Sequence, residues 1–349
     1  MRLYNQQHQF YCGVDLHART MYLCILDSAG AIVLHENLPS DPKRFLKAIA
    51  PYRCDLVVCC ECLFAWYWLG DLCAKEQIPF VLGHALYMKA IHGGKTKNDK
   101  IDAEKIARLL RGGNLPMAYP YPQGLRETRD LLRRRGYLVH QRASLIAHIQ
   151  ITNAQYNQPA FGKKLIYASN RRELAVAQCF ANPHVHKSIA ADLTVIDCLD
   201  VVIGDIELYL EKAVKVEDSQ TYHQLRTIPG VGKILALTLL YEIHDIKRFE
   251  TVGDFISYAR LVRCSHESAG KKTGSGGKKI GNAHLRWAFG EAACLLLRES
   301  DVGKRFLARK EQKHGKAKAL GLLAAKLGRA VYWMLRQEKA FDVTKFWHS

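Results

Sequence analysis

Four acidic residues within the first 102 positions have the types and spacing of a divalent-metal site. Asp15 ends one short apolar run, and Glu61 ends another. Asp99 and Asp102 stand three residues apart, so a helix would place both carboxylates on one face. An acid that interrupts an apolar strand is costly to bury unless it is paired or ligates a metal. Each acid alone could be a strand-end salt bridge or a helix cap, but the four together favour a metal site.

The chemistry of this set follows from its charge and its donor atoms. Four carboxylates that converge on one edge of a sheet repel one another unless divalent cations neutralise them. Ligands that are all oxygen suit Mg²⁺ or Mn²⁺. Two such ions ~3.5–4 Å apart can activate an attacking oxygen and stabilise the leaving oxygen of a phosphodiester. We therefore expect two Mg²⁺ or Mn²⁺ ions and phosphoryl transfer.

The elements that must position these acids form a mixed α/β sheet. The apolar runs predict a meander of three strands, followed by strands that alternate with helices. The predicted strands are 10–15, 20–27, 31–37, 55–61 and 79–83, and the predicted helices are 41–50, 65–75, 85–92 and 101–111. Asp99 then caps the last of these helices or lies in its first turn, where the helix dipole favours anions.

Composition indicates a polyanionic partner. The chain has 349 residues and a net charge of +18, enough length for two or more domains. Residues 1–110 carry 13 basic and 11 acidic residues, a net of +2, so +16 falls on the remainder. Nucleic acid is the natural partner for such a charge, and no basic amphipathic helix favours a membrane surface.

The sequence also limits the cellular compartment in which the protein is expected and argues against a zinc site. The polar start contains no secretory signal and the longest apolar stretch is too short to span a bilayer, so we expect a cytoplasmic protein. Eleven cysteines without a regular framework indicate reduced thiols. Cys59, Cys60 and Cys62 lack the spacing of a zinc site.

The pattern predicts four segments along the chain. These are a catalytic domain over 1–113, a proline-marked linker over 114–123, a long-helix coiled-coil region over 124–216 and a mostly α C-terminal domain over 217–349. The long helices are 125–156 and 189–214, later helices are 282–298 and 313–337, and 341–349 is a tail. Arg129 and Arg133 belong to basic faces of the first long helix, which either are solvated or hold protomers together and touch nucleic acid.

Residues 225–240 match a helix-hairpin-helix. Ile228-Pro-Gly230-Val-Gly232-Lys233 separates two apolar helical stretches, and the free N–H groups at the start of the second helix can bind a phosphate. Gly230, Gly232 and Lys233 are therefore predicted backbone contacts to nucleic acid. A simple corner of a helical bundle is the alternative. A Walker phosphate loop is excluded because its motif does not occur.

A loop over 261–282 is rich in glycine, lysine and serine. Its lysines can bind phosphates or balance charge that develops on a phosphate during reaction. These lysines are Lys271, Lys272, Lys278 and Lys279. The loop either binds phosphate alone, with incidental serines, or supplies a nucleophilic serine, which needs a base or a metal to attack phosphorus.

The acids, with the motifs that follow them, resemble one family. Gly13-Val-Asp15, the strand that ends in Glu61 and Asp99-x-x-Asp102-Ala are similar to the Asp-Glu-Asp-Asp set of RuvC-like nucleases. More narrowly, they resemble the N-terminal domain of the Piv-related insertion-sequence transposases, the DEDD recombinases. The likeness continues through Trp66-Tyr-Trp-Leu and Arg129-Asp-Leu-Leu-Arg133 to the serine loop.

The resemblance implies an RNase H/RuvC-like fold for the first domain and a site-specific DNA recombinase that moves an insertion sequence. It implies Ser268 as nucleophile, with Ser265 as second candidate, meeting the four carboxylates across a domain or subunit boundary. The implied partners are donor and target DNA, a structured guide RNA from the same element, and further copies of the chain in a dimer or tetramer. The implied location during activity is the bacterial nucleoid.

Two other functions fit parts of the pattern. A structure-selective nuclease of Holliday-junction type would use the same four acids with water as nucleophile, and the serine loop would then only bind phosphate. A non-catalytic nucleic-acid-binding protein with a decayed metal site is the third reading, and the presence of all four acids argues against it.

Overall fold

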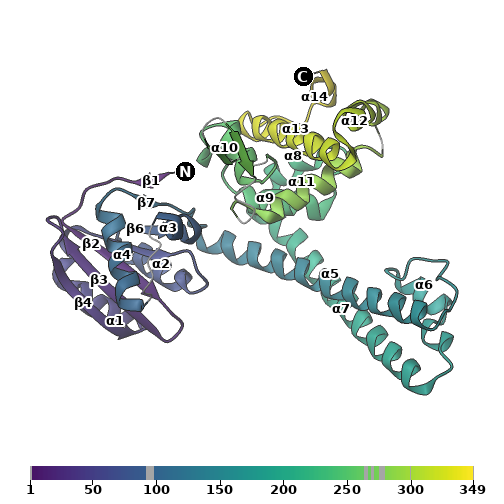
Figure 1. Ribbon diagram of the computed structural model, residues 1–349, viewed down its shortest axis with the longest axis horizontal. Helices are drawn as coiled ribbons and strands as arrows, with labels where there is room; N and C mark the ends of the chain where they lie inside the picture. Colours follow the sequence, from purple (N-terminus) through teal and green to yellow (C-terminus); the bar gives the residue numbers. More distant parts are fainter. Residues whose placement is uncertain are drawn as a thin grey trace. The chain divides into compact units, whose positions relative to one another are not determined.

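The structure is a computed structural model that describes residues 2–91, 98–262, 266–268, 271–274, 280–298 and 300–348. The chain forms two compact units, Met1–Gln123 and Gly124–Ser349. Figure 1 shows a sheet with helices in the first unit and helices almost throughout the second.

A five-stranded sheet forms the frame of the first unit, in the order β4-β3-β2-β5-β6. Its strands are β2 (Phe10–Leu16), β3 (Thr20–Asp27), β4 (Ile32–Pro39), β5 (Leu56–Glu61) and β6 (Phe80–Gly83). The β2, β3 and β4 strands form an antiparallel meander, whereas β5 pairs parallel with both β2 and β6. This arrangement confirms the predicted mixed five-stranded sheet. The sheet was predictable because apolar runs such as Leu-Val-Val-Cys-Cys in β5 are typical of a buried central strand.

Helices cover both faces of this sheet. They are α1 (Pro42–Ile49), η1 (Ala50–Asp55), α2 (Trp66–Lys75), α3 (Ala85–Ile91) and α4 (Asp99–Arg111). The α1 and α2 helices pack through Phe45 and Leu69 on one face, against residues that include Cys12 and Val58. The α4 helix packs on the other face, against residues next to these in the strands. This alternation follows from the two-residue period of a strand.

One strand of a short pair lies inside the segment that the sequence predicts as a linker. The β7 strand (Leu115–Pro116) pairs antiparallel with β1 (Leu3–Tyr4), and neither strand was predicted. Two-residue strands leave no periodic pattern to detect.

Two long helices open the second unit, α5 (Gln123–Gln155) and α7 (Pro183–Glu217), with α6 (Ala168–Glu173) and η2 (Val176–Cys179) between them. They run antiparallel, since Arg135 pairs with Glu207 and Arg142 with Asp200. Four buried residues of α7 recur every seven positions, the period of a coiled coil, and Val214 is buried one turn after the last of them. The four are Ile189, Ile196, Ile203 and Leu210.

The rest of the second unit is a helical bundle. It comprises α8 (Ser219–Arg226), α9 (Lys233–Ile243), η3 (Ile246–Arg248), α10 (Val252–Tyr258), the strands β8 (His266–Ser268) and β9 (Lys271–Gly274), α11 (Ala283–Leu296), α12 (Asp301–His314), α13 (Lys316–Arg336) and α14 (Val343–His348). The α9 helix is central, because every residue from Leu235 to Ile243 is buried. The mostly helical C-terminal region predicted from the sequence is confirmed.

Two predictions for this region were wrong in detail. The helix predicted over 313–337 begins at Lys316, after Gly315, and α12 precedes it as an unpredicted helix. The predicted tail contains α14, whose Phe346 is buried. No helix among the described residues is both long and apolar enough to cross a membrane.

Candidate metal centre and serine loop

Two of the predicted acids lie at the same edge of the sheet. The β2 and β5 strands are parallel and pair Val14 with Cys60, so Asp15 and Glu61 are the next residues on neighbouring strands. The carboxyl ends of parallel strands meet at one edge, which is a common place for a functional site. Asp15 is largely buried, with 14% of its side chain exposed.

Gly13 lets α4 approach this edge closely. A Cβ on Gly13 would overlap the backbone of Ala103 and Ala107 and lie 3.0 Å from the Cβ of Ile106. Gly13 and Asp15 are two residues apart, so they face the same side of the sheet. The absent side chain therefore lets α4 pack directly over the strand that carries Asp15.

The first turn of α4 carries the other two acids. Asn98 caps the helix, and its side chain accepts a hydrogen bond of 2.8 Å from the Ile101 backbone N–H. Asp99 and Asp102 follow in the first turn, where the helix dipole stabilises their negative charge. The Asp102 carboxylate lies 3.4 Å from Lys105 Nζ, one turn along the helix.

His17 joins the acidic cluster, and the sequence reasoning missed it. Its Nε2 lies 3.4 Å from Asp15 Oδ2 and 3.6 Å from Asp99 Oδ1. One ligand atom from each of the three residues lies within 4.8 Å of the others, close enough to share an ion. The Asp15-x-His17 spacing, which places both side chains on one face, was the available signal.

The electrostatics of the cluster fit a bound cation. Burial raises the pKa of Asp15, and the charges of Asp99 and Asp102 raise it further, whereas His17 lowers it. Carboxylates that resist ionisation in this way are stabilised when a cation enters. The donor set of oxygens with one imidazole nitrogen therefore fits a divalent metal.

The serine loop belongs to the second unit and is described in part. Ser268 ends β8 and pairs with Lys271 of β9, whose side chain is exposed. Lys272 lies in the same strand. Ser265, Lys278 and Lys279 lie outside the described residues, as does the Ala-Gly that follows Ser268.

Both ends of this loop are held against the end of α10. The backbone N–H of Asn282 donates to the Tyr258 carbonyl at 2.6 Å, and Arg260 Nε donates to the Ile280 carbonyl at 2.8 Å. Asn282 also caps α11 by accepting from the His284 and Leu285 backbone N–H groups. The two ends of the segment that contains Ser268 are therefore hydrogen-bonded to each other at the end of α10.

A buried carboxylate links Asn282, at the end of this loop, to the long helix α5. Glu242 of α9 is 1% exposed, and it accepts hydrogen bonds from Arg129 at 3.0 Å and Arg133 at 2.6 Å. Asn282 Nδ2 donates to the same carboxylate at 2.7 Å. These partners outweigh the desolvation that burial imposes and hold the pKa of Glu242 at about 2. An acid within the apolar run Leu-Ala-Leu-Thr-Leu-Leu-Tyr-Glu was the signal in the sequence.

Two predicted nucleic-acid contacts on α5 thus have a structural partner. Arg129 and Arg133 both donate to Glu242, so this carboxylate offsets one of their two positive charges inside the unit. Their contact with nucleic acid stays a prediction. The acids that pair with the arginines of α5 come from α9 and α7, so the sequence of α5 alone does not reveal them.

The predicted hairpin joins α8 to α9 through Gly230 and Gly232. Gly230 has a φ of +80°, and a Cβ there would lie 2.7 Å from the Leu296 backbone nitrogen, so this glycine serves packing against α11. Gly232 precedes α9 and has open space around it. Lys233 pairs with Glu211 at 2.7 Å. The phosphate contact of this turn stays a prediction.

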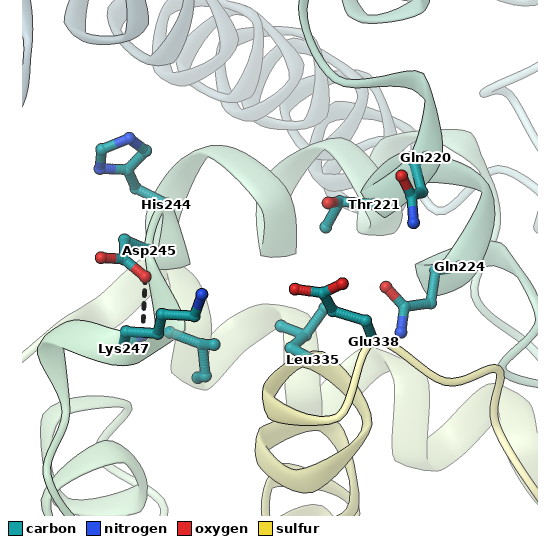
Figure 2. Close-up of a pocket in the computed structure, with 9 residues that line it drawn as sticks. Gln220, Thr221, Gln224, His244, Asp245, Lys247, Leu335 and Glu338 are labelled. Carbon is teal, nitrogen blue, oxygen red and sulfur yellow. Dashed lines mark hydrogen bonds between the residues drawn. The ribbon is translucent and has the colours of Figure 1, made fainter.

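A surface hollow of about 420 Å³ lies elsewhere in the second unit (Figure 2). Glu338 and Gln224 face it from one side and Lys247 from the other, and the Lys247 backbone N–H donates to Asp245 at 2.7 Å. Its lining mixes amides with both charges. Such a lining does not supply the converging carboxylates that phosphoryl transfer needs.

Comparisons with known proteins cover both parts of the candidate site. Residues 12–156 match a sequence model described as DEDD transposase of the IS110 type, and residues 222–308 match the IS116/IS110/IS902 transposase family. The transposase for insertion sequence element IS1111A from Coxiella burnetii (strain RSA 493 / Nine Mile phase I) is 25% identical over 335 residues, which cover 94% of this chain and 90% of that protein. The transposase for insertion sequence element IS1328 from Yersinia enterocolitica is 27% identical over 197 residues, 54% of this chain and 56% of that protein.

Proposed function

We propose that this chain, which belongs to the IS110 family of transposases, moves an insertion sequence by cutting and joining DNA with a metal-bound acidic tetrad and a serine nucleophile. Its activity as a transposase is a DNA phosphoryl transfer of the DEDD type. The observation that carries the proposal is the convergence of Asp15 and Asp99, from β2 and α4, within ligand distance of one ion.

The tetrad holds the metal in this proposal. Asp15, Glu61, Asp99 and Asp102 would bind Mg²⁺ or Mn²⁺. His17, which lies with Asp15 and Asp99 within ligand distance of one ion, would add a nitrogen donor. Two divalent ions per site would supply Lewis-acid stabilisation of the charge on the phosphate. The carboxylates would hold these ions at the edge of the sheet, and the dipole of α4 lowers the cost of keeping Asp99 and Asp102 ionised.

Ser268 supplies the attacking hydroxyl. Its Oγ forms a bond to phosphorus as the bond from phosphorus to the 3′ oxygen breaks. The serine hydroxyl proton passes to a base, and the leaving 3′ oxygen takes up a proton from solvent. The products are a phosphoserine at the 5′ side and a DNA strand that ends in a 3′-hydroxyl. Strand exchange reverses the step, when a 3′-hydroxyl attacks the phosphoserine. Lys271, next to Ser268 in the pairing of β8 with β9, balances negative charge on the phosphate.

The covalent adduct tests the nucleophile. Ser268→Ala should abolish a protein–DNA adduct and leave DNA binding intact, whereas Ser265→Ala should retain the adduct. Asp15→Asn should abolish the adduct through loss of metal. Denaturing gels with end-labelled DNA read all three. An adduct that persists in Ser268→Ala would exclude this serine, and hydrolysed nicks with no attached protein would favour the structure-selective nuclease.

Two partners extend the proposal. The family resemblance implies a guide RNA from the same element in addition to donor and target DNA, and the net charge of +18 is compatible with it. Exposed apolar residues on α5 and α7 support a homo-oligomer, dimer or tetramer. They are Tyr137, Ile151, Val195, Val201, Val202, Leu208, Tyr209 and Val216. Sequencing of RNA that purifies with the protein, and light scattering before and after ribonuclease, test the two partners separately.

A further inference from the structure

We propose that the outer face of α12 is a binding surface for the backbone of duplex DNA. Arg305, Arg309 and Lys313, the α12 stripe, recur every four residues and are all exposed. A four-residue spacing places them along one side of the helix. The inference rests on the DNA-transposase function proposed above and adds a site to it.

The excess charge of the chain concentrates in this region. Residues 301–336 contain ten basic and two acidic residues, a net of +8 out of +18 in about a tenth of the chain. Residues 123–217, which include α5 and α7, contain 13 basic and ten acidic residues, a net of +3. Field strength follows uncompensated charge, so a polyanion is drawn to the first region more than to the second.

The stripe also differs from the long helices in its pairing. Arg135 and Arg142 on α5 each meet a carboxylate of α7. Among the described residues, the ion pair that α12 makes joins Lys304 to Asp301 at 2.9 Å, and no ion pair involves the stripe, although the charge of Arg305 also acts on Asp301. Its charges are therefore available to an external anion.

Helix stability accounts for only one residue of the stripe, Lys313, which lies in the last turn of α12 where the helix dipole favours cations. Like charges four residues apart destabilise a helix by about 0.2–0.5 kcal/mol for each pair. Beyond Gly315, Lys316 and Lys318 are exposed in the first turn of α13, where the helix dipole disfavours cations. The local positive field also acts on His314, whose pKa is lowered by desolvation and then by Lys318, Lys313 and Lys310. Binding of an anion relieves this repulsion.

The dimensions of the stripe favour duplex DNA. Arg305 and Lys313 are eight residues apart, which is ~12 Å along a helix axis. The major groove of B-form DNA is ~12 Å wide, so the two ends of the stripe can reach phosphates on both sides of it. The inner face of α12 is occupied by the protein, because Phe306 packs against Trp347 and lies under Lys310. Only the outer face is left for DNA.

Salt dependence of binding tests the site. The full-length protein with Ser268→Ala, in EDTA, binds a 30-base-pair duplex DNA of mixed sequence in fluorescence anisotropy across a range of salt, so chemistry plays no part. Neutralising the stripe with Arg305→Gln, Arg309→Gln and Lys313→Gln should lower the slope of log K against log salt by ~2.7, since each phosphate contact contributes ~0.9. The ratio of parent affinity to variant affinity should then fall ~40-fold as salt rises from 50 to 200 mM.

Three further measurements make the test specific. Lys43→Gln, Arg44→Gln and Lys47→Gln remove the same charge from exposed positions on α1 and should leave the slope unchanged. Arg305→Lys, Arg309→Lys and Lys313→Arg keep the charge and should keep the slope. Equal slopes for the stripe and α1 variants would overturn the proposal, as would a loss seen with a 30-base-pair RNA duplex and not with DNA. Adduct formation by the protein with Ser268 intact reports the proposed function separately.

Discussion

The buried carboxylate of Glu242 gives a stability prediction with a calculable size. Its pKa falls from an ordinary 4.5 to about 2, because Arg133, Arg129 and Asn282 stabilise the ionised form more than burial disfavours it. The two pKa values differ by about 2.5, which corresponds to about 3 kcal/mol of folding free energy. Glu242→Gln should therefore destabilise the second unit by about 3 kcal/mol at pH 7, in line with the loss of a buried ion pair.

The pH dependence of this effect has a definite sign. A depressed folded-state pKa stabilises the protein above the unfolded value of 4.5, and this stability is lost as pH falls through 4.5 toward 2. The difference in unfolding free energy between the parent and Glu242→Gln should thus reach its maximum at pH 6–7 and be close to zero near pH 2. Hydrogen exchange of α9 amides across a urea series reads it, because α9 lies in the core of the second unit.

A surface pair provides the control. Glu211 meets Lys233 outside the core, so water screens the pair, and Glu211→Gln should change stability far less. The reasoning fails if Glu242→Gln changes the unfolding free energy by under 1 kcal/mol at pH 7. It also fails if the difference does not shrink in acid, since then the carboxylate charge is not its source.

Three other changes test the packing and the donor set. Gly13→Ala should lower Mn²⁺ affinity in titration calorimetry and destabilise the first unit by about 1–3 kcal/mol, because the methyl group meets the backbone of α4. Gly230→Ala should lower the melting temperature, since the site has a φ of +80° and no space, whereas Gly232→Ala, in open space at a negative φ, should change it little. His17→Ala should weaken Co²⁺ binding about tenfold and Mg²⁺ binding less, because imidazole suits the softer ion; equal losses for the two ions would exclude His17 as a ligand.

The sheet could be predicted because its strands are continuous apolar runs or clean alternations. The helix of Asp99 and Asp102 was visible for the same reason, through its cap and its periodic Ile106, Leu109 and Leu110. The packing of α4 over Gly13 could not be predicted, because one glycine in a strand does not indicate which element packs against it.

Charge balance across distant segments was the main thing that the sequence concealed. An arginine-rich stretch such as α5 gives no sign that Glu242, more than a hundred residues later, faces Arg133. The opposite error occurred at α12, where a polar, basic stretch was passed over and forms a helix with an open face. Pairing depends on tertiary contacts, which local composition does not encode.

The close packing of α4 on β2 also bears on the synthesis of the protein. Asp15 leaves the ribosome long before Asp99, and the two carboxylates become neighbours only after α4 has docked on a finished sheet. A nascent or truncated polypeptide that ends before α4 would hold isolated acids with weak affinity for metal. The ability to break a chromosome would then arise late, as a property of the completed first unit.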